Sequence, residues 1–333
     1  MTAPLDLKRL AQGERIQETL LVLEVEQRSF GPDKACTVLT LGNARGRIPT
    51  APFWNGDQGR VDGVARGHVV QVIGEVGSYR DRRQLNVTSL RVLPKDSVDP
   101  RALLPSVGDV TRYWALLDRW RGDVRGPRLR RTLALFYDDF DFRAGYEACP
   151  ASVRGHHAVL GGLLKHTCEV ATIARAIAKA CRADPDLVLA GALLHDIGKL
   201  EAYRWDGIFE HTESGLLLGH VVLGALMLDR KVRAEPDPPC SEQELMLLHH
   251  LVLSHHGVRE HGAPVEPMTL EAEVLHYADN ASAKTASMAE VLADPDNFPG
   301  DAAVTPSAHW MIRRRAYRGG SDWGVNEEPH SES

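Results

Sequence analysis

The sequence predicts an α+β protein of more than one domain, in which a small β-rich domain precedes an all-α domain. Its 333 residues exceed the length of one average domain and suit two. Short stretches rich in Val, Leu and Thr occur in the first hundred residues, whereas helical periodicity dominates from Asp109 onward. With 43% hydrophobic and 25% charged residues, the composition is typical of a soluble globular protein.

The first hundred residues predict about five short strands and contain no helix long enough to cross over between strands. Apolar and polar residues alternate most clearly around Val70, Val72 and Val76. Such strands are typical of a small closed barrel such as the OB-fold, with another small barrel or a sandwich as the alternative. The expected strands are Thr19–Val25, Cys36–Leu41, His68–Val76 and Gln84–Val92, and turn sequences lie at residues 31–33, 55–57 and 80–83.

Helical periodicity follows a linker that contains three prolines. We expect residues 1–93 to form the five-stranded OB-type barrel, 94–108 the linker, 109–293 the all-α domain and 294–333 a C-terminal segment. That segment should contain a short basic helix, Ala308–Arg318, and a disordered tail, 319–333. Within the all-α domain the expected helices are Asp109 or Thr111 to Trp120, Arg128–Phe140, Leu163–Cys181, Asp186–Leu200, Glu213–Asp229, Glu242–His255 and Leu270–Leu292.

Composition excludes several classes of protein. No run of about 18 apolar residues predicts a membrane span, and residues 1–10 lack the apolar core of a signal peptide. The five cysteines are odd in number and show no CxxC spacing, which favours a reducing cytoplasm over a disulfide framework or a zinc ribbon. The net charge is −6, but residues 1–105 carry 15 Lys and Arg against 12 Asp and Glu. A mildly basic front half is compatible with a polyanionic ligand.

The segment LVLAGALLHDIGK places an imidazole and a carboxylate directly after a buried stripe. His195 and Asp196 follow two leucines at the end of the expected helix. An Asp beside a core stripe is unfavourable unless it is paired or bound to a metal. An isolated His-Asp pair is nevertheless most often a neutral core histidine beside a surface carboxylate.

The same pattern recurs on other helices of the all-α domain. His166, Asp279, His220 and the pair His255-His256 each lie at the edge of an apolar stripe. Five such placements in one domain favour a shared explanation over five satisfied core residues. Imidazole and carboxylate ligands suit Mn, Fe, Zn or Co, so the sequence predicts a metal site.

These residues resemble the H…HD…D motif of the HD superfamily of phosphohydrolases. The motif corresponds to His166, His195-Asp196 and Asp279, with His220 and His255 as the intermediate histidines of two-metal members. The match spans roughly residues 155–284. The strings HHAVLGGLLKHT, AGALLHDIGK and LSHHG further resemble the YhaM-type HD-domain 3′→5′ exoribonucleases. Members of that family carry an N-terminal OB-fold and cleave single-stranded RNA, and often DNA, with Mn²⁺ or a similar ion.

The front half carries motifs that agree with this closer resemblance. Phe53-Trp54 and the Tyr79…Gln84-Leu85 hairpin occur where the family's OB-fold has a Trp and a Tyr-x-x-x-x-Gln-Leu hairpin. Their rings could stack bases or merely plug the barrel. Residues 40–51 depart from the family, because they lack the acidic residue usual before the turn. The substrate-binding candidates in this half are Trp54, Tyr79, Arg80 and Arg82.

Further candidates lie near the expected metal site. Lys199, one turn beyond His195, is a candidate catalytic residue that could contact a phosphate, although a lone surface lysine is an equal alternative. His156 and His157 match paired histidines of the family and could bind phosphate, protonate a leaving group or have a structural role. His256 is a further substrate-binding candidate. His195 and Asp196 complete the expected catalytic set.

The resemblance implies a metal-dependent 3′→5′ exoribonuclease that hydrolyses single-stranded RNA, and single-stranded DNA as a further expected substrate. One or two divalent ions, Mn²⁺ or else Fe²⁺, Co²⁺ or Mg²⁺, would activate water. An HD-domain small-nucleotide phosphodiesterase or nucleotidase is the main alternative, and a non-catalytic RNA-binding regulator is the second. No membrane partner is expected, and a homo-oligomer is compatible with the sequence.

Overall fold

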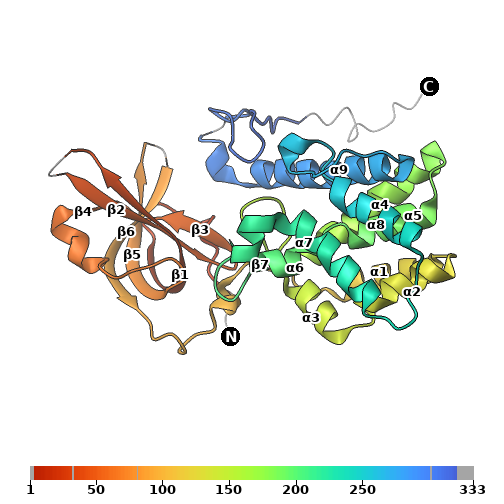
Figure 1. The fold of residues 1–333 in the computed structure, drawn as a ribbon. Coiled ribbons are helices and arrows are strands. Elements are labelled where there is room, and N and C mark those ends of the chain that lie inside the picture. The colour runs from red at the N-terminus through yellow and green to blue at the C-terminus, as the bar shows by residue number, and fades with distance from the viewer. Residues whose placement is uncertain (1–3, 32–33, 81, 301, 321–333) are drawn as a thin grey trace, which may run out of the picture.

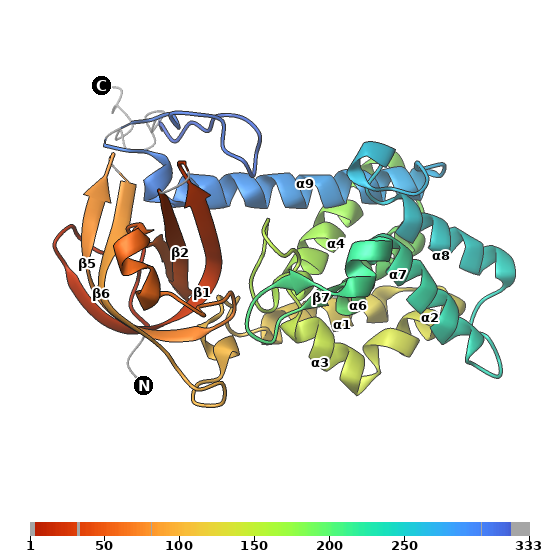
Figure 2. The ribbon, with the colours of Figure 1, turned by 60° about the vertical axis from the view of Figure 1, so that its left-hand side comes forward.

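The computed structural model describes residues 4–31, 34–80, 82–300 and 302–320. A β-domain lies beside a larger helical domain, and the long helix α9, Leu270–Ala293, runs along the helical domain toward the β-domain (Figures 1 and 2). Within the described residues, no helix combines the length and hydropathy needed to span a membrane.

The β-domain is a mainly antiparallel sheet in the order β3-β2-β1-β5-β6, and β4 pairs with β2. Three of the four strands placed from the sequence lie within an observed strand, and the fourth, His68–Val76, begins one residue before the observed strand at Val69. The strands are β1 Arg15–Ser29, β2 Ala35–Asn43, β3 Gly46–Pro49, β4 Phe53–Trp54, β5 Val69–Tyr79 and β6 Arg82–Val92, and a 3₁₀ turn, Asn55–Arg60, follows β4.

The two ends of this sheet approach each other without a continuous ladder. Thr50 pairs with Leu85 of β6 through an isolated bridge, and the Ala51 amide donates to the Leu85 carbonyl at 2.9 Å. Buried leucines such as Leu20, Leu39 and Leu85 form the core that the sheet encloses. This arrangement is consistent with an OB-like barrel that stays open in the described part of the chain.

The helical domain begins after the predicted linker and contains the long helices expected from periodicity. One expected helix, Arg128–Phe140, is two helices, because Asp139 accepts hydrogen bonds from the amides of Asp141 and Phe142 and starts a new helix. Another, Asp186–Leu200, ends at Leu194. The helices are α1 Thr111–Asp123, α2 Pro127–Tyr137, α3 Phe140–Ala148, α4 Gly162–Cys181, α5 Pro185–Leu194, α6 Lys199–Ala202, α7 Glu213–Arg233, α8 Glu242–Ser254 and α9.

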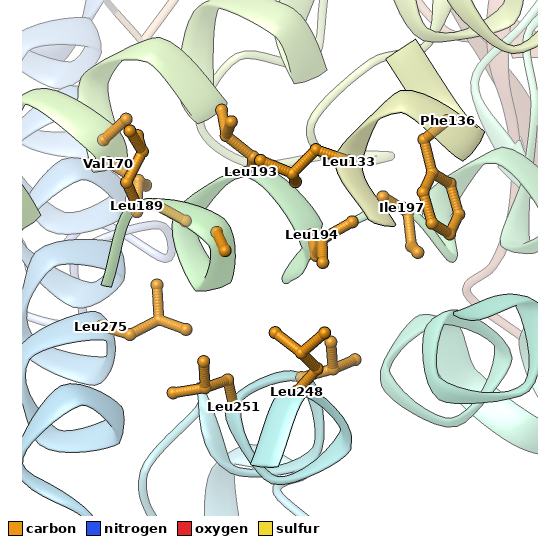
Figure 3. Packing of buried hydrophobic residues seen from close by; sticks show 14 of the residues in the cluster. Leu133, Phe136, Val170, Leu189, Leu193, Leu194, Ile197, Leu248, Leu251 and Leu275 are labelled. Atoms are coloured by element: carbon orange, nitrogen blue, oxygen red, sulfur yellow. The ribbon is translucent and has the colours of Figure 1, made fainter. Parts of the chain in front are cut away.

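Helix α5 is apolar on all sides and lies at the centre of the helical core. Leu189, Leu193 and Leu194 are buried there, between Leu133 and Phe136 on one side and the helices that carry Leu248, Leu251 and Leu275 on the other (Figure 3). A helix without a polar face must be surrounded by other elements. The residues that follow α5, His195 and Asp196, are therefore placed inside the domain.

The two domains share an apolar cluster and specific polar contacts. Leu21 and Val69 of the sheet pack with Leu104 of the linker and with Phe209, which precedes strand β8. Strands β7, Tyr203–Arg204, and β8, Glu210–His211, form a small hairpin that the sequence did not predict. The Arg83 guanidinium donates to both carboxylate oxygens of Asp296, at 2.9 and 2.6 Å.

The segment predicted as a linker is fixed against the helical domain. The Leu160 amide donates to the Pro105 carbonyl at 2.8 Å, and the Val107 amide donates to the Leu160 carbonyl at 3.0 Å. A 3₁₀ turn, Pro100–Leu103, precedes this pairing. Residues 94–108 therefore join the domains without acting as a free tether.

The expected basic helix Ala308–Arg318 is wrong: these residues form turns and isolated bridges. The Thr305 amide donates to the Ala316 carbonyl at 3.0 Å, and the Thr305 hydroxyl accepts from the Ala316 amide at 3.1 Å. Ile312 and Ala316 are buried against Val291 and Phe298. This packing and the pairing of Thr305 with Ala316 override the local helical propensity. Most of the expected disordered tail, residues 321–333, lies outside the described residues.

Candidate metal centre

Five helices bring imidazoles and carboxylates to one point inside the helical domain. α4 carries His166, the turn after α5 carries His195 and Asp196, and α9 carries Asp279. α7 and the end of α8 supply the remaining histidines. The six residues that the sequence analysis assigned to a metal therefore converge, and they are His166, His195, Asp196, His220, His255 and Asp279.

A first cluster surrounds one oxygen of Asp196. The Nε2 atoms of His166 and His195 and a carboxylate oxygen of Asp196 all lie within 4.8 Å of one another. Asp196 Oδ2 is 3.2 Å from His195 Nε2 and 3.5 Å from His166 Nε2. Asp279 Oδ1 is 3.0 Å from His166 Nε2 and 3.9 Å from His195 Nε2. Four donor atoms thus face a common centre.

A second cluster surrounds the other oxygen of the same carboxylate. Asp196 Oδ1 is 3.3 Å from His220 Nε2 and 3.8 Å from His255 Nε2. His256 joins these histidines, since ring nitrogens of all three lie within 4.8 Å of one another. The sequence analysis had considered His256 for substrate binding only. Asp196 therefore faces both clusters, one with each oxygen.

The second cluster contains buried polar atoms whose hydrogen-bonding capacity is unused. Asp196 Oδ1, His220 Nε2 and His255 Nε2 find no hydrogen-bond partner among the described residues. Such groups are unfavourable in a protein interior unless an ion or water satisfies them. Because imidazole nitrogen and carboxylate oxygen are the donors of many divalent-metal sites, the clusters fit a divalent metal ion.

Backbone carbonyls fix the proton on three of these histidines. Nδ1 lies 2.8 Å from the Ala192 carbonyl in His195 and 2.7 Å from the Val252 carbonyl in His255. His256 Nδ1 lies 2.7 Å from the carbonyl of His261. A carbonyl only accepts, so Nδ1 must carry the hydrogen and Nε2 keeps its lone pair for a cation.

Burial and charge set the protonation of the clusters. Burial lowers the pKa of His166, lowers that of His220 to about 3 and depresses that of His255 further. Burial alone would raise the pKa of Asp196, but the neighbouring charges of Lys199 and His195 outweigh it and hold this pKa well below its usual range. His166, His220 and His255 are therefore neutral beside an ionised carboxylate, as metal binding requires. Burial would also lower the pKa of His195, but the charge of Asp196 outweighs burial and raises it.

Lys199 is buried and lies against Asp196, not at the surface. Its Nζ is 2.5 Å from Asp196 Oδ2. Burial would lower the pKa of Lys199, but the carboxylate of Asp196 outweighs burial and raises it. The lysine therefore supplies a fixed positive charge beside the clusters.

The paired histidines of the α3–α4 loop have different environments. The His156 ring lies 5.1 Å from the His166 ring, between centroids, and so borders the first cluster. His157 is buried, and its Nε2 lies 2.7 Å from Glu169 Oε2. Its imidazole is thus engaged by a carboxylate on α4.

The candidates on the β-domain are not brought to the clusters. Trp54 is 40% exposed on β4, beside the ring of Phe30, and Figure 1 shows β4 on the side of the sheet remote from the helices. Tyr79 is 61% exposed with the Arg80 guanidinium 5.3 Å from its ring. Arg82, at the start of β6, is also exposed. These side chains are open to a ligand on the sheet.

Sequence reasoning missed Glu169 and Ser282. His166 Nδ1 lies 3.1 Å from Ser282 Oγ, and that hydroxyl donates to Glu169 Oε2 at 2.9 Å. Each residue lies three positions after a predicted ligand on the same helix, His166 on α4 and Asp279 on α9. Because residues three apart share a helix face, this spacing was a signal that could have identified them.

Comparisons with known proteins agree with this geometry. The family model described as "HD domain" matches residues 163–284. The 3′-5′ exoribonuclease YhaM of Bacillus subtilis (strain 168) is 30% identical over 283 residues, which cover 84% of this chain and 88% of that protein. The YhaM protein of Bacillus velezensis is 30% identical over 290 residues, with the same coverage. That of Geobacillus sp. (strain WCH70) is 29% identical, covering 82% of this chain and 83% of the relative. This chain therefore belongs to the family of the YhaM 3′-5′ exoribonucleases.

Proposed function

We propose that this protein is a metal-dependent 3′→5′ exoribonuclease that hydrolyses single-stranded RNA. The observation that carries the proposal is Asp196, whose two oxygens face separate clusters of histidine Nε2 atoms at 3.2–3.8 Å. A shared carboxylate between two donor sets is suited to two ions acting on one phosphate. The YhaM relatives are named for the same activity.

We assign His166, His195, Asp196 and Asp279 to one divalent ion. His220, His255 and Asp196 would hold a second, with His256 as an additional donor. We propose Mn²⁺ as the native ion because the donor set combines imidazole with carboxylate, and Fe²⁺, Co²⁺ and Mg²⁺ are to be compared with it. Divalent ions in such sites make water a better nucleophile and offset negative charge on phosphoryl oxygens.

The reaction adds a water oxygen to the phosphorus of the last phosphodiester linkage and breaks the bond from that phosphorus to the O3′ of the preceding nucleotide, which takes up a proton derived from the water. It releases a nucleoside 5′-monophosphate and leaves a new 3′-hydroxyl. Burial, followed by the charges of His166 and Lys199, lowers the pKa of His156 to about 3. At neutral pH His156 is therefore uncharged, and we assign it to hydrogen bonding with a phosphate oxygen, not to protonating the leaving group.

Lys199 and the β-domain have supporting roles in this proposal. Lys199 keeps Asp196 ionised and adds positive charge close to the phosphate. On the sheet, the exposed rings of Trp54 and Tyr79 would stack bases, and Arg80 and Arg82 would contact phosphates. The five cysteines are free thiols, which supports a cytoplasmic location.

The test is hydrolysis of a 5′-labelled single-stranded RNA of about 20 nucleotides. With Mn²⁺ the label should pass through a ladder of successively shorter products, and EDTA should stop the reaction reversibly. Asp196→Asn should abolish it, because one amide cannot supply two anionic oxygens. A DNA strand of the same sequence tests the second substrate class.

Two substrates separate the alternatives. Cleavage of a circular RNA would exclude exonuclease action and indicate an endonuclease. Hydrolysis confined to mononucleotides or cyclic nucleotides would favour the small-nucleotide hydrolase. Binding of RNA without any hydrolysis by the metal-loaded protein would favour the regulatory alternative.

A further inference from the structure

A chain of hydrogen bonds leads away from the first cluster into the space between α4 and α9. It starts at His166 Nδ1, 3.1 Å from the Ser282 hydroxyl, which donates to Glu169 Oε2 at 2.9 Å. His157 Nε2 lies 2.7 Å from the same carboxylate oxygen, and the His157 amide donates to Glu290 at 3.0 Å. The chain therefore connects a predicted ligand to the α3–α4 loop.

The chemistry of the groups fixes the direction of the hydrogen bonds between His166 Nδ1, Ser282 and Glu169. An ionised carboxylate only accepts, so the single hydroxyl hydrogen of Ser282 points to Glu169. The Ser282 oxygen must then accept from His166 Nδ1, which consequently carries the hydrogen. Burial alone would raise the pKa of Glu169, but hydrogen bonds from His157 and Ser282 outweigh it, so this pKa is lowered and the group is ionised at neutral pH.

His166 differs from the three histidines whose Nδ1 faces a backbone carbonyl. His195, His255 and His256 place Nδ1 against backbone carbonyls, which cannot donate. A hydroxyl can donate or accept, so Ser282 without Glu169 could donate to Nδ1 and leave the hydrogen on Nε2, where Asp279 Oδ1, 3.0 Å away, would accept it. In that tautomer His166 Nε2, the ring nitrogen that faces Asp279 and Asp196, would carry a hydrogen and could not bind a cation.

We propose that Glu169 and Ser282 are positioning residues that hold His166 in the tautomer with hydrogen on Nδ1, so that Nε2 is free to bind the metal ion. His157 anchors Glu169 from the opposite side and has no direct contact with substrate in this assignment. The inference rests on the proposed metal site and adds residues that act through His166. It also replaces the expectation that His157 binds substrate.

Metal affinity, measured by competition with a chromogenic chelator for Mn²⁺ or Zn²⁺, tests the proposal without reference to turnover. Ser282→Ala and Glu169→Ala should each lower the affinity for one ion by about 10–100-fold, the range for partners of metal ligands. Combining them should lower it little further, because both act through one hydrogen bond to His166. Glu169→Gln should retain most affinity, since its amide oxygen can accept from both neighbours.

Ser287→Ala is the matched control. Ser287 is also a buried serine of α9, but its hydroxyl donates to the Ala283 carbonyl of its own helix at 2.8 Å. Its removal should leave metal affinity unchanged. Thermal unfolding of the metal-free variants shows whether each is folded. Ser282→Thr keeps a hydroxyl at this position, so it should retain more metal affinity than Ser282→Ala if the loss is specific.

His166→Ala separates a failure of the positioning role from a failure of the metal site itself. His166→Ala should lose an ion outright. If it does so while Ser282→Ala and Glu169→Ala keep wild-type affinity, the positioning role is refuted and the metal site stands. If His166→Ala itself retains both ions, the assignment of the site fails and the positioning role fails with it. Equal losses in Ser282→Ala and Ser287→Ala would show a general packing effect and also refute the proposal.

Discussion

The turn that carries His195 and Asp196 lies so close to α7 that Gly198 cannot be replaced without movement. A Cβ added at Gly198 would lie 2.1 Å from the His220 carbonyl oxygen and 2.3 Å from the Gly224 amide nitrogen. Both contacts are with backbone, so no side chain can rotate to relieve them. Ordinary contacts begin near 3.4 Å, and Gly198→Ala must therefore separate the turn from α7 by roughly 1 Å.

That displacement acts on the second cluster. Asp196 and His220 lie on opposite sides of the contact, with Oδ1 and Nε2 3.3 Å apart. Metal ligands tolerate deviations of only about 0.2 Å, so a separation of roughly 1 Å should weaken binding of the second ion. The overpacking itself should lower the free energy of unfolding by about 1–3 kcal/mol.

Urea unfolding of the metal-free protein and metal content per chain measure the two effects of Gly198→Ala. Gly122→Ala is the matched control, because Gly122 lies in α1 with nothing within 4 Å of an added Cβ. There the substitution should raise stability by about 0.5–1 kcal/mol through helix propensity. Wild-type stability and two tightly bound ions in Gly198→Ala would refute this account of the turn.

Three further expectations follow from the site and the sheet. Because His156 and His220 have folded pKa values of about 3 against an ordinary 6.5, the unfolded chain binds more protons between these values. The unfolding free energy of the metal-free protein should therefore fall as pH drops from 6.5 toward 4, by up to about 1.4 kcal/mol per pH unit for each group, and His156→Gln should reduce this slope in urea titrations. His220→Ala should remove one ion of two in elemental analysis, and unchanged stoichiometry would indicate a single-ion site. Trp54→Ala should weaken binding of a long single strand by about 1–3 kcal/mol while leaving hydrolysis of a dinucleotide unchanged, and equal effects on both substrates would place Trp54 outside the RNA path.

Sequence patterns located the elements and the clustered histidines and aspartates for the same physical reason. A stripe that must be buried, such as Leu187–Leu194, leaves little choice for the polar residues at its end. The sequence alone therefore predicts that His195 and Asp196 lie inside the domain. Likewise, the alternation of apolar residues in β5 follows from one buried face, and this strand was expected.

Features set by contacts distant in sequence were not predictable in this way. The segment 308–318 has a helical composition, yet its pairing with Thr305 and its burial against Val291 give turns. Lys199 was a candidate for phosphate contact with a surface lysine as the equal alternative, and no pattern near it in the sequence predicts its burial against Asp196. The role of Ser282 depends on α4 and α9 being neighbours, which no pattern within either helix states.

The α3–α4 loop connects the β-domain to the metal centre. Arg154 lies 3.3 Å from Glu24 of β1, and Leu160 is hydrogen-bonded to Pro105 of the linker. Between these two points, His156 borders His166 and His157 is bonded to Glu169. The same loop thus contacts both the β-domain and the clusters. A loop fixed at both ends can place its histidines more closely than a free one, since less conformational entropy remains to be lost. The β-domain therefore helps to fix the geometry around His166, besides any role in RNA binding. Removing it should consequently disturb the metal site as well as RNA binding.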